Sequence, residues 1–446
     1  MHTKAEKIRK MMVGIEAKIE LDDKSTSPAI NLDNAATTPP FKGVMEQINK
    51  ELCFYGSIGR GEGQKSEHAT TIYTNGRETI KKFFGADSPA YTVCYANNTT
   101  DAINKLASAL IQSPDDLVLT TRMEHHANDL PWRERATLLY AEVDELGRLN
   151  MDDLEQILIA HNGKIKYVTV TAASNVTGYL NDVHYIAKLA HEHGAYLIVD
   201  GAQVAAHYEM SLLGETPEEN IDFFVFSAHK MYSPYGGGGI VGRKDLLDLN
   251  FPKFYGGGTV DAVSDTGAIY HDAPDSFEAG SPNYASIVGM LTTMDILKYE
   301  IGFDYLQSHE RQLLEKTIAG LRSIPGVTLY GDSDDLSDRL GIVTFNIAEL
   351  TPIETAGILA SHYGIATRHA AFCAHPYVRR LTGEVGDEAP VGMVRASFGV
   401  YTSDSDIETF LDAVAHIANN DYMQTKAKHH FIKTWHIQIG KPHDRG

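Results

Sequence analysis

Two short apolar segments, each followed by an ionisable side chain, most constrain what this chain can fold into. Residues 197–199 lead into Asp200, and residues 223–226 lead shortly afterwards to Lys230. Apolar runs of this length predict buried strands. The four glycines at 236–239 let another group approach the backbone closely. The sequence therefore predicts two buried strands that end in a carboxylate and an amine.

Lys230 and Asp200 are the groups that a protein needs to hold pyridoxal phosphate (PLP). At the mouth of a buried strand the lysine amine is poorly hydrated, so it loses its proton more readily and can attack a carbonyl to form a Schiff base. The aspartate can pair with the pyridinium nitrogen and keep it protonated. Taken separately, a solvated lysine and a turn aspartate explain the two residues equally well. Their combination with the segments below favours PLP as the cofactor.

Composition excludes several classes of protein. The net charge of −20 argues against a nucleic-acid partner and leaves a small-molecule substrate or a protein partner. The three cysteines are far apart and lack metal-type spacing, which predicts no disulfide framework and a reducing compartment. The N-terminus lacks the apolar core of a signal peptide, and no apolar run has the length needed to span a bilayer. We therefore expect a cytoplasmic protein that binds neither nucleic acid nor membrane.

Through most of the chain, apolar segments alternate with segments of helical periodicity. Further strands are expected at 91–95, 117–120 and 167–170, with helices between them. Such strand–helix units predict an α/β fold with a mostly parallel sheet covered by helices on both faces. After Gly302 the pattern changes and predicts a smaller α/β domain. The expected parts are a lead-in (1–30), a large PLP-binding domain (31–302), a small C-terminal domain (303–420) and a polar tail (421–446).

A polar turn at residues 97–100 separates an expected strand from an expected helix. It places free N–H groups and the hydroxyls of Thr99 and Thr100 at a helix N-terminus, which suits a phosphate. Thr99 acting only as the helix N-cap explains the pattern as well. In parallel sheets, ligands bind beyond the carboxyl ends of the strands, where all the polar groups considered so far are expected.

His125 and His126 follow the expected strand at 117–120. Two adjacent histidines could bind a metal, but no third ligand lies at a suitable spacing, so no metal site is expected. Stacking of an imidazole on a flat aromatic cofactor is the favoured interpretation.

Taken in order, the motifs resemble the class V aminotransferase group of fold-type I PLP enzymes, most closely the group II cysteine desulfurases and selenocysteine lyases. The resemblance spans about residues 30–418. It implies the PLP-dependent transferase fold type I, with a large, mostly parallel sheet domain and a smaller C-terminal α/β domain. The segments that carry it are 32–37, 123–128 with 131–132, 174–176, 199–203, 226–230 and 277–283.

The resemblance also implies roles for individual residues. Lys230 would hold PLP covalently, Asp200 would pair with its pyridine nitrogen, and His125 would stack on its ring. Arg395 would clamp the amino-acid carboxylate, a bidentate task suited to guanidinium, and Arg368 opens the thiol motif beside the substrate. The other implied contacts are Gln203 near the phenolate oxygen, Asn175 near the ring or the substrate carboxylate, Thr99, Thr100, Ser227 and His229 at the phosphate, and Ser281 reaching the phosphate of the second subunit of a homodimer.

Cys373 falls on the position of the family's catalytic thiol, within the segment 364–376. A thiolate there could attack the sulfur of a PLP-bound cysteine, keep it as a persulfide and release alanine. The resemblance thus implies a cysteine desulfurase acting on L-cysteine or selenocysteine, with a sulfur-acceptor protein as a candidate partner. The alternative is a buried structural cysteine, which is how most lone cysteines behave.

Some residues depart from the family pattern. Ala370 stands where the family usually has glycine, which predicts a different path for the loop that carries Cys373. Asn98 replaces the glycine of the phosphate turn, a mild change because asparagine tolerates similar backbone angles. Another class V enzyme, an aminotransferase or an isopenicillin N epimerase-like enzyme in which Cys373 is incidental, stays open as an alternative. A PLP-fold scaffold without activity is a third interpretation.

Overall fold

The structure is a computed structural model that describes residues 4–59, 61–249, 254–386 and 388–419. The expected polar tail (421–446) lies outside these residues. In the described part of the chain, no helix combines the length and apolar character needed to cross a bilayer.

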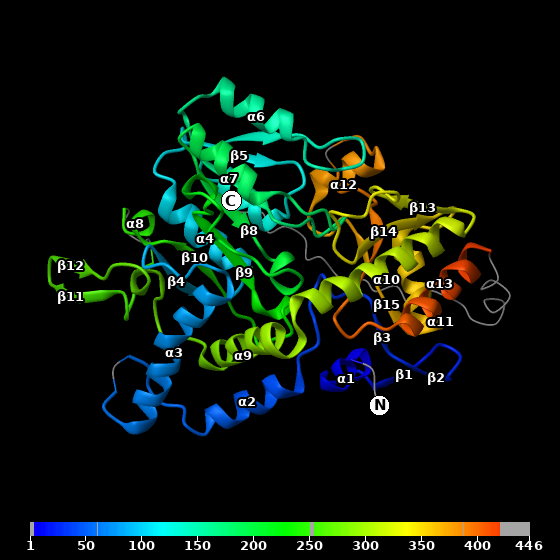
Figure 1. Ribbon diagram of the computed structural model, residues 1–446, viewed down its shortest axis with the longest axis horizontal. Coiled ribbons are helices and arrows are strands. Elements are labelled where there is room, and N and C mark those ends of the chain that lie inside the picture. The colour runs from blue at the N-terminus through cyan, green and yellow to red at the C-terminus, as the bar shows by residue number, and fades with distance from the viewer. Residues whose placement is uncertain (1–3, 60, 250–253, 387, 420–446) are drawn as a thin grey trace, which may run out of the picture.

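A seven-stranded sheet forms the centre of the large domain (Figure 1). All its neighbouring strands are parallel except β10, which is antiparallel to both of its neighbours. This mostly parallel sheet confirms the predicted α/β fold class. In spatial order the strands are β4 (Tyr91–Ala96), β10 (Gly238–Arg243), β9 (Phe223–Ser227), β8 (Tyr196–Asp200), β7 (Ile165–Thr171), β5 (Leu117–Thr121) and β6 (Thr137–Ala141).

Helices cover both faces of this sheet (Figure 1). The helices of the large domain and the lead-in are α1 (Lys4–Met11), α2 (Lys42–Leu52), α3 (Gln64–Phe83), α4 (Thr99–Leu110), α5 (Leu130–Arg133), α6 (Met151–Ala160), α7 (Val183–Glu192), α8 (Lys244–Leu247) and α9 (Tyr284–Asp295). Those of the small domain are α10 (Phe303–Ser323), α11 (Pro352–Tyr363), α12 (His375–Thr382) and α13 (Asp404–Ala418).

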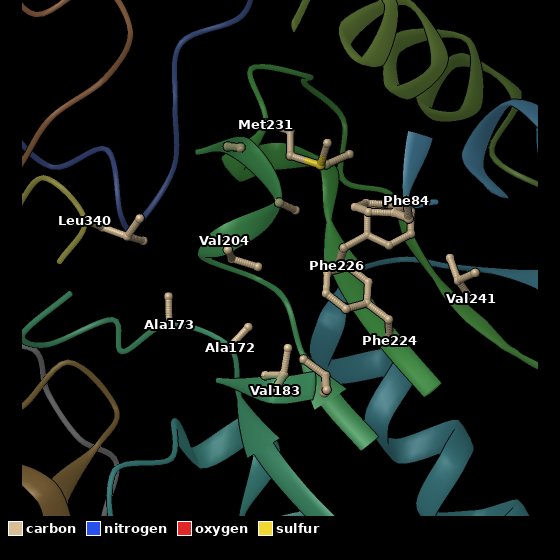
Figure 2. Close-up of a cluster of buried hydrophobic side chains, with 14 of the residues drawn as sticks. Phe84, Ala172, Ala173, Val183, Val204, Phe224, Phe226, Met231, Val241 and Leu340 are labelled. Carbon is tan, nitrogen blue, oxygen red and sulfur yellow. The ribbon is translucent and has the colours of Figure 1, made fainter. Parts of the chain in front are cut away.

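Strand β9 shows why the sheet needs cover on both faces, because all five of its residues are buried. Phe224 and Phe226 point into the apolar cluster that includes α7, as Figure 2 shows. Phe223 and Val225 point the other way, into the cluster that includes α4. Side chains alternate between the faces of a strand, so a continuous apolar run suits a strand that is buried on both sides. Burying each phenylalanine stabilises the fold by about 1.5–3 kcal/mol.

The small domain has a four-stranded antiparallel sheet, on which α10, α11 and α13 pack. The chain enters it after Gly302, whose positive φ of 80° permits the turn into α10. In spatial order its strands are β13 (Val327–Tyr330), β14 (Ile342–Ile347), β17 (Met393–Ser397) and β16 (Arg368–Ala370).

The N-terminal lead-in ends on the small domain. Strand β3 (Ile30–Asn31) pairs in parallel with β15 (Ile365–Ala366), and Leu32 lies in the small-domain core. Asn31 thus contacts the small domain through this strand pairing and Leu32 through its buried apolar side chain, although the sequence predicts both residues at the start of the large domain. The lead-in also contains α1 and a hairpin of β1 (Lys18–Glu20) and β2 (Thr26–Pro28).

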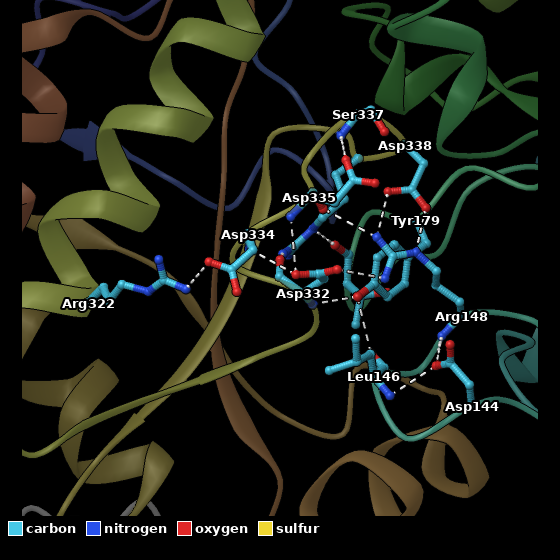
Figure 3. A network of polar contacts seen from close by, with 12 residues as sticks. Asp144, Leu146, Arg148, Tyr179, Arg322, Asp332, Asp334, Asp335, Ser337 and Asp338 are labelled. Atoms are coloured by element: carbon cyan, nitrogen blue, oxygen red, sulfur yellow. Dashed lines mark hydrogen bonds and ion pairs between the residues drawn. The ribbon is translucent and has the colours of Figure 1, made fainter.

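Arg148 joins the two domains on the surface (Figure 3). Its guanidinium donates to Asp338 Oδ2 at 2.8 Å and to Asp332 Oδ2 at 2.9 Å, both in a loop of the small domain. The same guanidinium lies 4.7 Å from the centre of the Tyr179 ring of the large domain. These contacts hold the loop of the small domain that contains Asp332 and Asp338 next to the Arg148 and Tyr179 segments of the large domain.

A second hairpin, β11 (Val260–Ser264) and β12 (Gly267–Tyr270), projects from the large domain (Figure 1). Two of its apolar side chains, Val263 and Ile269, are 70% and 64% exposed. Such exposure leaves an apolar surface at the edge of the molecule.

Candidate active site

A cavity of about 280 Å³ lies beyond the carboxyl ends of β8 and β9 and is closed by residues of the small domain. All the site residues predicted from the sequence line it, except Ser281. From the large domain these are Thr99, Thr100, His125, Asn175, Asp200, Gln203, Ser227, His229 and Lys230, and from the small domain Arg368, Cys373 and Arg395.

Lys230 ends a short helical turn, Ala228–Lys230, directly after β9. Burial lowers the pKa of its amine to about 8, although the charge of Asp200 opposes this shift. Among the described residues, no group forms a hydrogen bond or an ion pair with Nζ. At pH 7 about one-tenth of such amines are uncharged, against a far smaller fraction for an ordinary lysine. Lys230 is thus a nucleophile and proton acceptor that the protein leaves free.

Asp200 is buried at the end of β8. Its Oδ1 accepts from the main-chain N–H of Ala202 at 2.9 Å, whereas Oδ2 has no hydrogen bond within the described part of the chain. Burial raises the pKa of this carboxyl, and the nearby Lys230 opposes the shift. A buried carboxylate with an unpaired oxygen is stabilised by a positively charged N–H group.

His125 presents a neutral imidazole to the cavity. Its Nδ1 accepts from the main-chain N–H of Ala127 at 3.0 Å, so the ring proton lies on Nε2. Burial lowers the pKa of His125 to about 3, and the charge of Lys230 adds to this effect. A flat, uncharged ring of this kind suits stacking on an aromatic ligand.

A buried polar network fixes the turn that carries His125. The carboxylate of Glu124 accepts from Thr121 Oγ1 at 2.6 Å and from Asn128 Nδ2 at 2.7 Å. The side-chain oxygen Oδ1 of Asn128 accepts from Trp132 Nε1 at 3.1 Å. Burial raises the pKa of Glu124 to about 8. Most of the polar residues in the sequence motif around the two histidines therefore hold the turn in place by hydrogen bonds.

The N-terminus of α4 faces the cavity together with Ser227. Thr99 donates its main-chain N–H to Ser227 Oγ, and the two hydroxyls lie 2.8 Å apart. The helix N-cap is Asn98, whose side chain accepts from Asp101 N at 2.9 Å. Thr99 is therefore the first helical residue, and the N-cap interpretation of Thr99 is wrong. Thr99, Thr100 and Ser227 are left as hydroxyl donors at a helix start, which suits an anion.

Three further residues of this wall are held by hydrogen bonds. His229 Nδ1 lies 3.2 Å from Thr37 Oγ1, and burial lowers the pKa of His229 to about 4. Gln203 Nε2 donates to the Ala35 carbonyl at 3.0 Å. Asn175 bonds to the small domain: its Nδ2 donates to the Phe372 carbonyl, and its main-chain carbonyl accepts from Arg395 Nη1.

Arg395 is buried on β17 and points toward the large domain. Its Nη1 donates to the Asn175 carbonyl at 2.8 Å and its Nη2 to Asp33 Oδ1 at 3.1 Å. Its Nε is buried and has no hydrogen-bond partner among the described residues. The Phe372 ring lies 5.0 Å from the guanidinium carbon. Burial lowers the pKa of Arg395 to about 10, which still leaves it charged at neutral pH.

Asp33 lies between two arginines. Besides Arg395, it forms an ion pair of 3.6 Å with Arg368 Nη1, whose side chain is 56% exposed. The roles of Asp33 and Phe372 were not expected from the sequence, although Asp33 belongs to one of the segments that carry the family resemblance. The signal for Phe372 was its place directly before Cys373.

Cys373 is exposed and lies on the same cavity as Lys230, so it is not a buried structural cysteine. Its loop has three non-glycine residues with positive φ: Ala370 at 83°, Phe372 at 51° and Cys373 at 55°. Ala370 thus takes the backbone region that glycine prefers.

The comparisons with known proteins agree with this geometry. The model of the family described as "Aminotransferase class-V" matches residues 30–410. The chain belongs to the aminotransferase class-V family. The family resemblance seen in the sequence is confirmed.

Individual relatives of this class-V chain span most of its length. A probable cysteine desulfurase of Halalkalibacterium halodurans is 34% identical over 86% of this chain and 91% of its own length. A cysteine desulfurase of Haloferax volcanii is 33% identical over 88% of this chain and 90% of its own length. The apo structure of a cysteine desulfurase from Thermococcus onnurineus superposes with a TM-score of 0.80 at 31% identity, covering 88% of this chain and 95% of that one. The cysteine desulfurase CsdA of Escherichia coli has a TM-score of 0.78 at 26% identity, covering 94% of this chain and 100% of that one.

Class-V aminotransferases are PLP-dependent, and the residues in the cavity fit this cofactor. Lys230 offers an unpaired amine and Asp200 an unpaired carboxylate oxygen, and His125 offers a neutral ring. The helix start at Thr99 and Ser227 offers donors to an anion. In the described residues, no three His, Cys, Asp or Glu side chains are grouped to hold a metal ion.

Ser281 is the predicted site residue that the class-V chain does not bring to this cavity. It is exposed and borders a neighbouring cavity of about 190 Å³, beside Gly280 and Lys105. Gly280 donates to the Gly257 carbonyl at 2.8 Å, which links this loop to the segment before the projecting hairpin.

Proposed function

We propose that this protein is a PLP-dependent cysteine desulfurase, which converts L-cysteine, or selenocysteine, into L-alanine and keeps the sulfur on Cys373 as a persulfide. The observation that carries the proposal is the exposed thiol of Cys373 on the same cavity as the free amine of Lys230 and the buried Arg395. The relatives named cysteine desulfurase support the same assignment.

Each wall of the cavity supplies a different part of the reaction. PLP, when bound, supplies an electron sink for charge that develops on the substrate carbon. Lys230 would anchor the cofactor, Asp200 would hold its ring nitrogen, and His125 would cover its ring. Thr99, Thr100, Ser227 and His229 would bind its phosphate, and Gln203 would lie near its phenolate oxygen.

Arg395 binds the substrate carboxylate, with Asn175 and Arg368 beside it. The Phe372 ring covers its guanidinium and excludes water, which strengthens a charged hydrogen bond. Because the pKa of Lys230 is about 8, its amine can take the Cα proton and return it.

Cys373 takes the sulfur. Its thiolate attacks the substrate sulfur, the new S–S bond forms as the Cβ–S bond breaks, and the carbon keeps the electron pair of that bond. Protonation of this carbon then gives the methyl group of alanine. Because Cys373 is exposed, we also propose that a sulfur-acceptor protein collects the persulfide, in the reducing cytoplasm where such a thiol stays free.

The substitution Cys373→Ala tests the proposal. Incubated with L-cysteine and a thiol reductant, the wild-type holoenzyme should release alanine and sulfide in equal amounts. Incubated with L-cysteine and no reductant, its Cys373 peptide should gain one sulfur atom by mass. The variant should lose this activity by about a hundredfold or more while still binding PLP. Selenocysteine turnover should fall less, because selenium leaves more readily.

The control is Cys53→Ala, since Cys53 is also exposed but does not line the cavity. It should desulfurate cysteine at the wild-type rate. If Cys373→Ala does so too, the desulfurase mechanism fails and an aminotransferase or epimerase reaction takes its place.

We further propose that the protein works as a homodimer in which Ser281 of one subunit reaches the phosphate of the other. Two observations support this arrangement: Ser281 lies outside the cavity of its own chain, and the nearby hairpin exposes Val263 and Ile269. Sedimentation should give a dimer, and Ile269→Asp should give monomers that bind PLP more weakly. A fully active wild-type monomer at working concentration would overturn the proposal.

A further inference from the structure

The loop that carries Cys373 is fastened by the large domain at three consecutive peptide groups. Asn175 Nδ2 donates to the Phe372 carbonyl at 2.8 Å. The main-chain N–H of His126 donates to the Cys373 carbonyl at 2.6 Å. The main-chain N–H of His375 donates to His126 Nε2 at 3.3 Å. The peptide groups before and after Cys373, and the next one, therefore all end on residues of the other domain.

His126 makes two of these three bonds. Its Nε2 accepts a hydrogen bond, so the ring is neutral and its proton lies on Nδ1. Burial and the neighbouring His375 lower the pKa of His126, which favours this neutral form. The two imidazole rings also meet edge to face, with centroids 4.6 Å apart.

The loop needs such fastening because its backbone is in a conformation that its residues disfavour. Phe372 and Cys373 have φ of 51° and 55°, in the left-handed region where a side chain clashes with the following carbonyl. Residues persist in this region only when their surroundings hold them there. Without the contacts of His126, the loop would relax toward ordinary backbone angles, and the thiol would move.

His126 also directly follows His125. The two residues belong to one short turn, in which the Asn128 N–H donates to the His125 carbonyl at 2.8 Å. His125 faces the cavity, and His126 faces the loop. One turn thereby sets both the ring that covers the cofactor and the place of the thiol.

We propose that His126 is a positioning residue for Cys373: it holds the two peptide groups that follow the cysteine and so keeps the thiol directed at the substrate sulfur. This inference rests on the proposed desulfurase function. The sequence by itself offers only a metal-ligand role for His126, and no third ligand lies at a suitable spacing.

The test compares His126→Leu with His126→Gln. Leucine removes the acceptor at Nε2, whereas the amide oxygen of glutamine can replace it. In single-turnover reactions with L-cysteine, His126→Leu should load sulfur on Cys373 about three- to tenfold more slowly, the range expected for one hydrogen bond. His126→Gln should stay within about twofold of wild type. The KM for L-cysteine and the absorption of bound PLP should change little in both variants.

Two further readouts separate positioning from general damage. Iodoacetamide should label Cys373 of His126→Leu at least as fast as in wild type relative to Cys53, which is exposed on another part of the surface, because the thiol is displaced but not hidden. Hydrogen exchange of the amides in the segment 371–377 should be several-fold faster in His126→Leu than in wild type, and this readout needs no activity.

The outcomes distinguish the two hypotheses. If wild type releases no sulfide from cysteine, the proposed function fails, and the exchange result alone decides whether His126 fastens the loop. If exchange in the segment 371–377 is unchanged in His126→Leu, the positioning role is overturned. Equal losses in the glutamine and leucine variants, or a loss that appears as raised KM or lost PLP, would also overturn it.

Discussion

The two walls of the cavity are built in different ways. The large-domain wall, with Asp200 and Lys230, consists of the ends of β8 and β9, whose apolar residues are buried on both faces of a sheet. The small-domain wall, with Phe372, Cys373 and Arg395, depends on polar contacts that cross to the other domain. Burial of the two strands thus fixes Asp200 and Lys230, whereas a few hydrogen bonds place Phe372, Cys373 and Arg395. We expect changes in the large-domain wall to have the larger effects.

The largest expected effect is that of Lys230→Ala. In the proposed function the Lys230 amine is both the anchor of PLP and the proton acceptor, so its removal should lower alanine formation from L-cysteine by about a thousandfold or more. In the wild-type holoenzyme, borohydride reduction and peptide mapping should place the pyridoxyl group on Lys230. Label on another lysine would contradict the assignment.

Phe224→Ala tests the burial that supports this wall. The substitution leaves a cavity in the core shown in Figure 2, so the free energy of unfolding should fall by about 3–5 kcal/mol, measured by urea denaturation. The Phe224 ring also fills the space where a Cβ of Gly201 would stand. Gly201→Ala should therefore destabilise wild type by about 1–3 kcal/mol but much less in the Phe224→Ala background. Additive losses would show that the two residues do not compete for this space.

The rate at which PLP binds covalently to the apoenzyme should report the pKa of Lys230. Only the neutral amine attacks, and its pKa is lowered from the ordinary value to about 8. The rate should therefore rise about tenfold per pH unit below 8 and level off above it. Asp200→Asn should move the midpoint of this pH dependence lower, because the negative charge of Asp200 opposes the lowering of the Lys230 pKa by burial. A wild-type midpoint near the usual pKa of lysine would contradict the prediction that burial lowers the pKa of Lys230.

Arg148→Met should have the smallest effect, because it breaks only the polar junction in Figure 3. Its side chain is 25% exposed, so we expect a loss of about 1 kcal/mol in the free energy of unfolding, together with a modest fall in kcat. Arg322 offers a matched control, since it forms an ion pair with Asp334 on the surface. The side chain of Arg322 is 53% exposed and that of Asp334 83%. Arg322→Met should change stability by less than about 0.5 kcal/mol. Equal losses would mean that the junction contributes no more than a surface ion pair.

The residues at the ends of β8 and β9 could be predicted from the sequence, whereas the contacts that join the two domains could not. The α/β class and the residues at the ends of β8 and β9 follow from apolar runs that end in Asp200 and Lys230. The role of Asp33 could not be predicted in this way, because its partners Arg368 and Arg395 lie more than three hundred positions away. Nor could the packing of Leu32 on the small domain, since a short apolar segment does not show which of two cores it completes.

By itself the sequence determined the class of fold, the family and the chemistry of the strand ends, because strand periodicity and burial are encoded by neighbouring residues. Only the tertiary structure decided which side chains stay unpaired and which are held. It left Lys230 Nζ and Asp200 Oδ2 without partners among the described residues, and it fastened the peptide groups around Cys373 to Asn175 and His126. The reason is physical: pKa shifts, left-handed backbone angles and contacts between domains depend on groups that are distant in the chain and meet only when it folds.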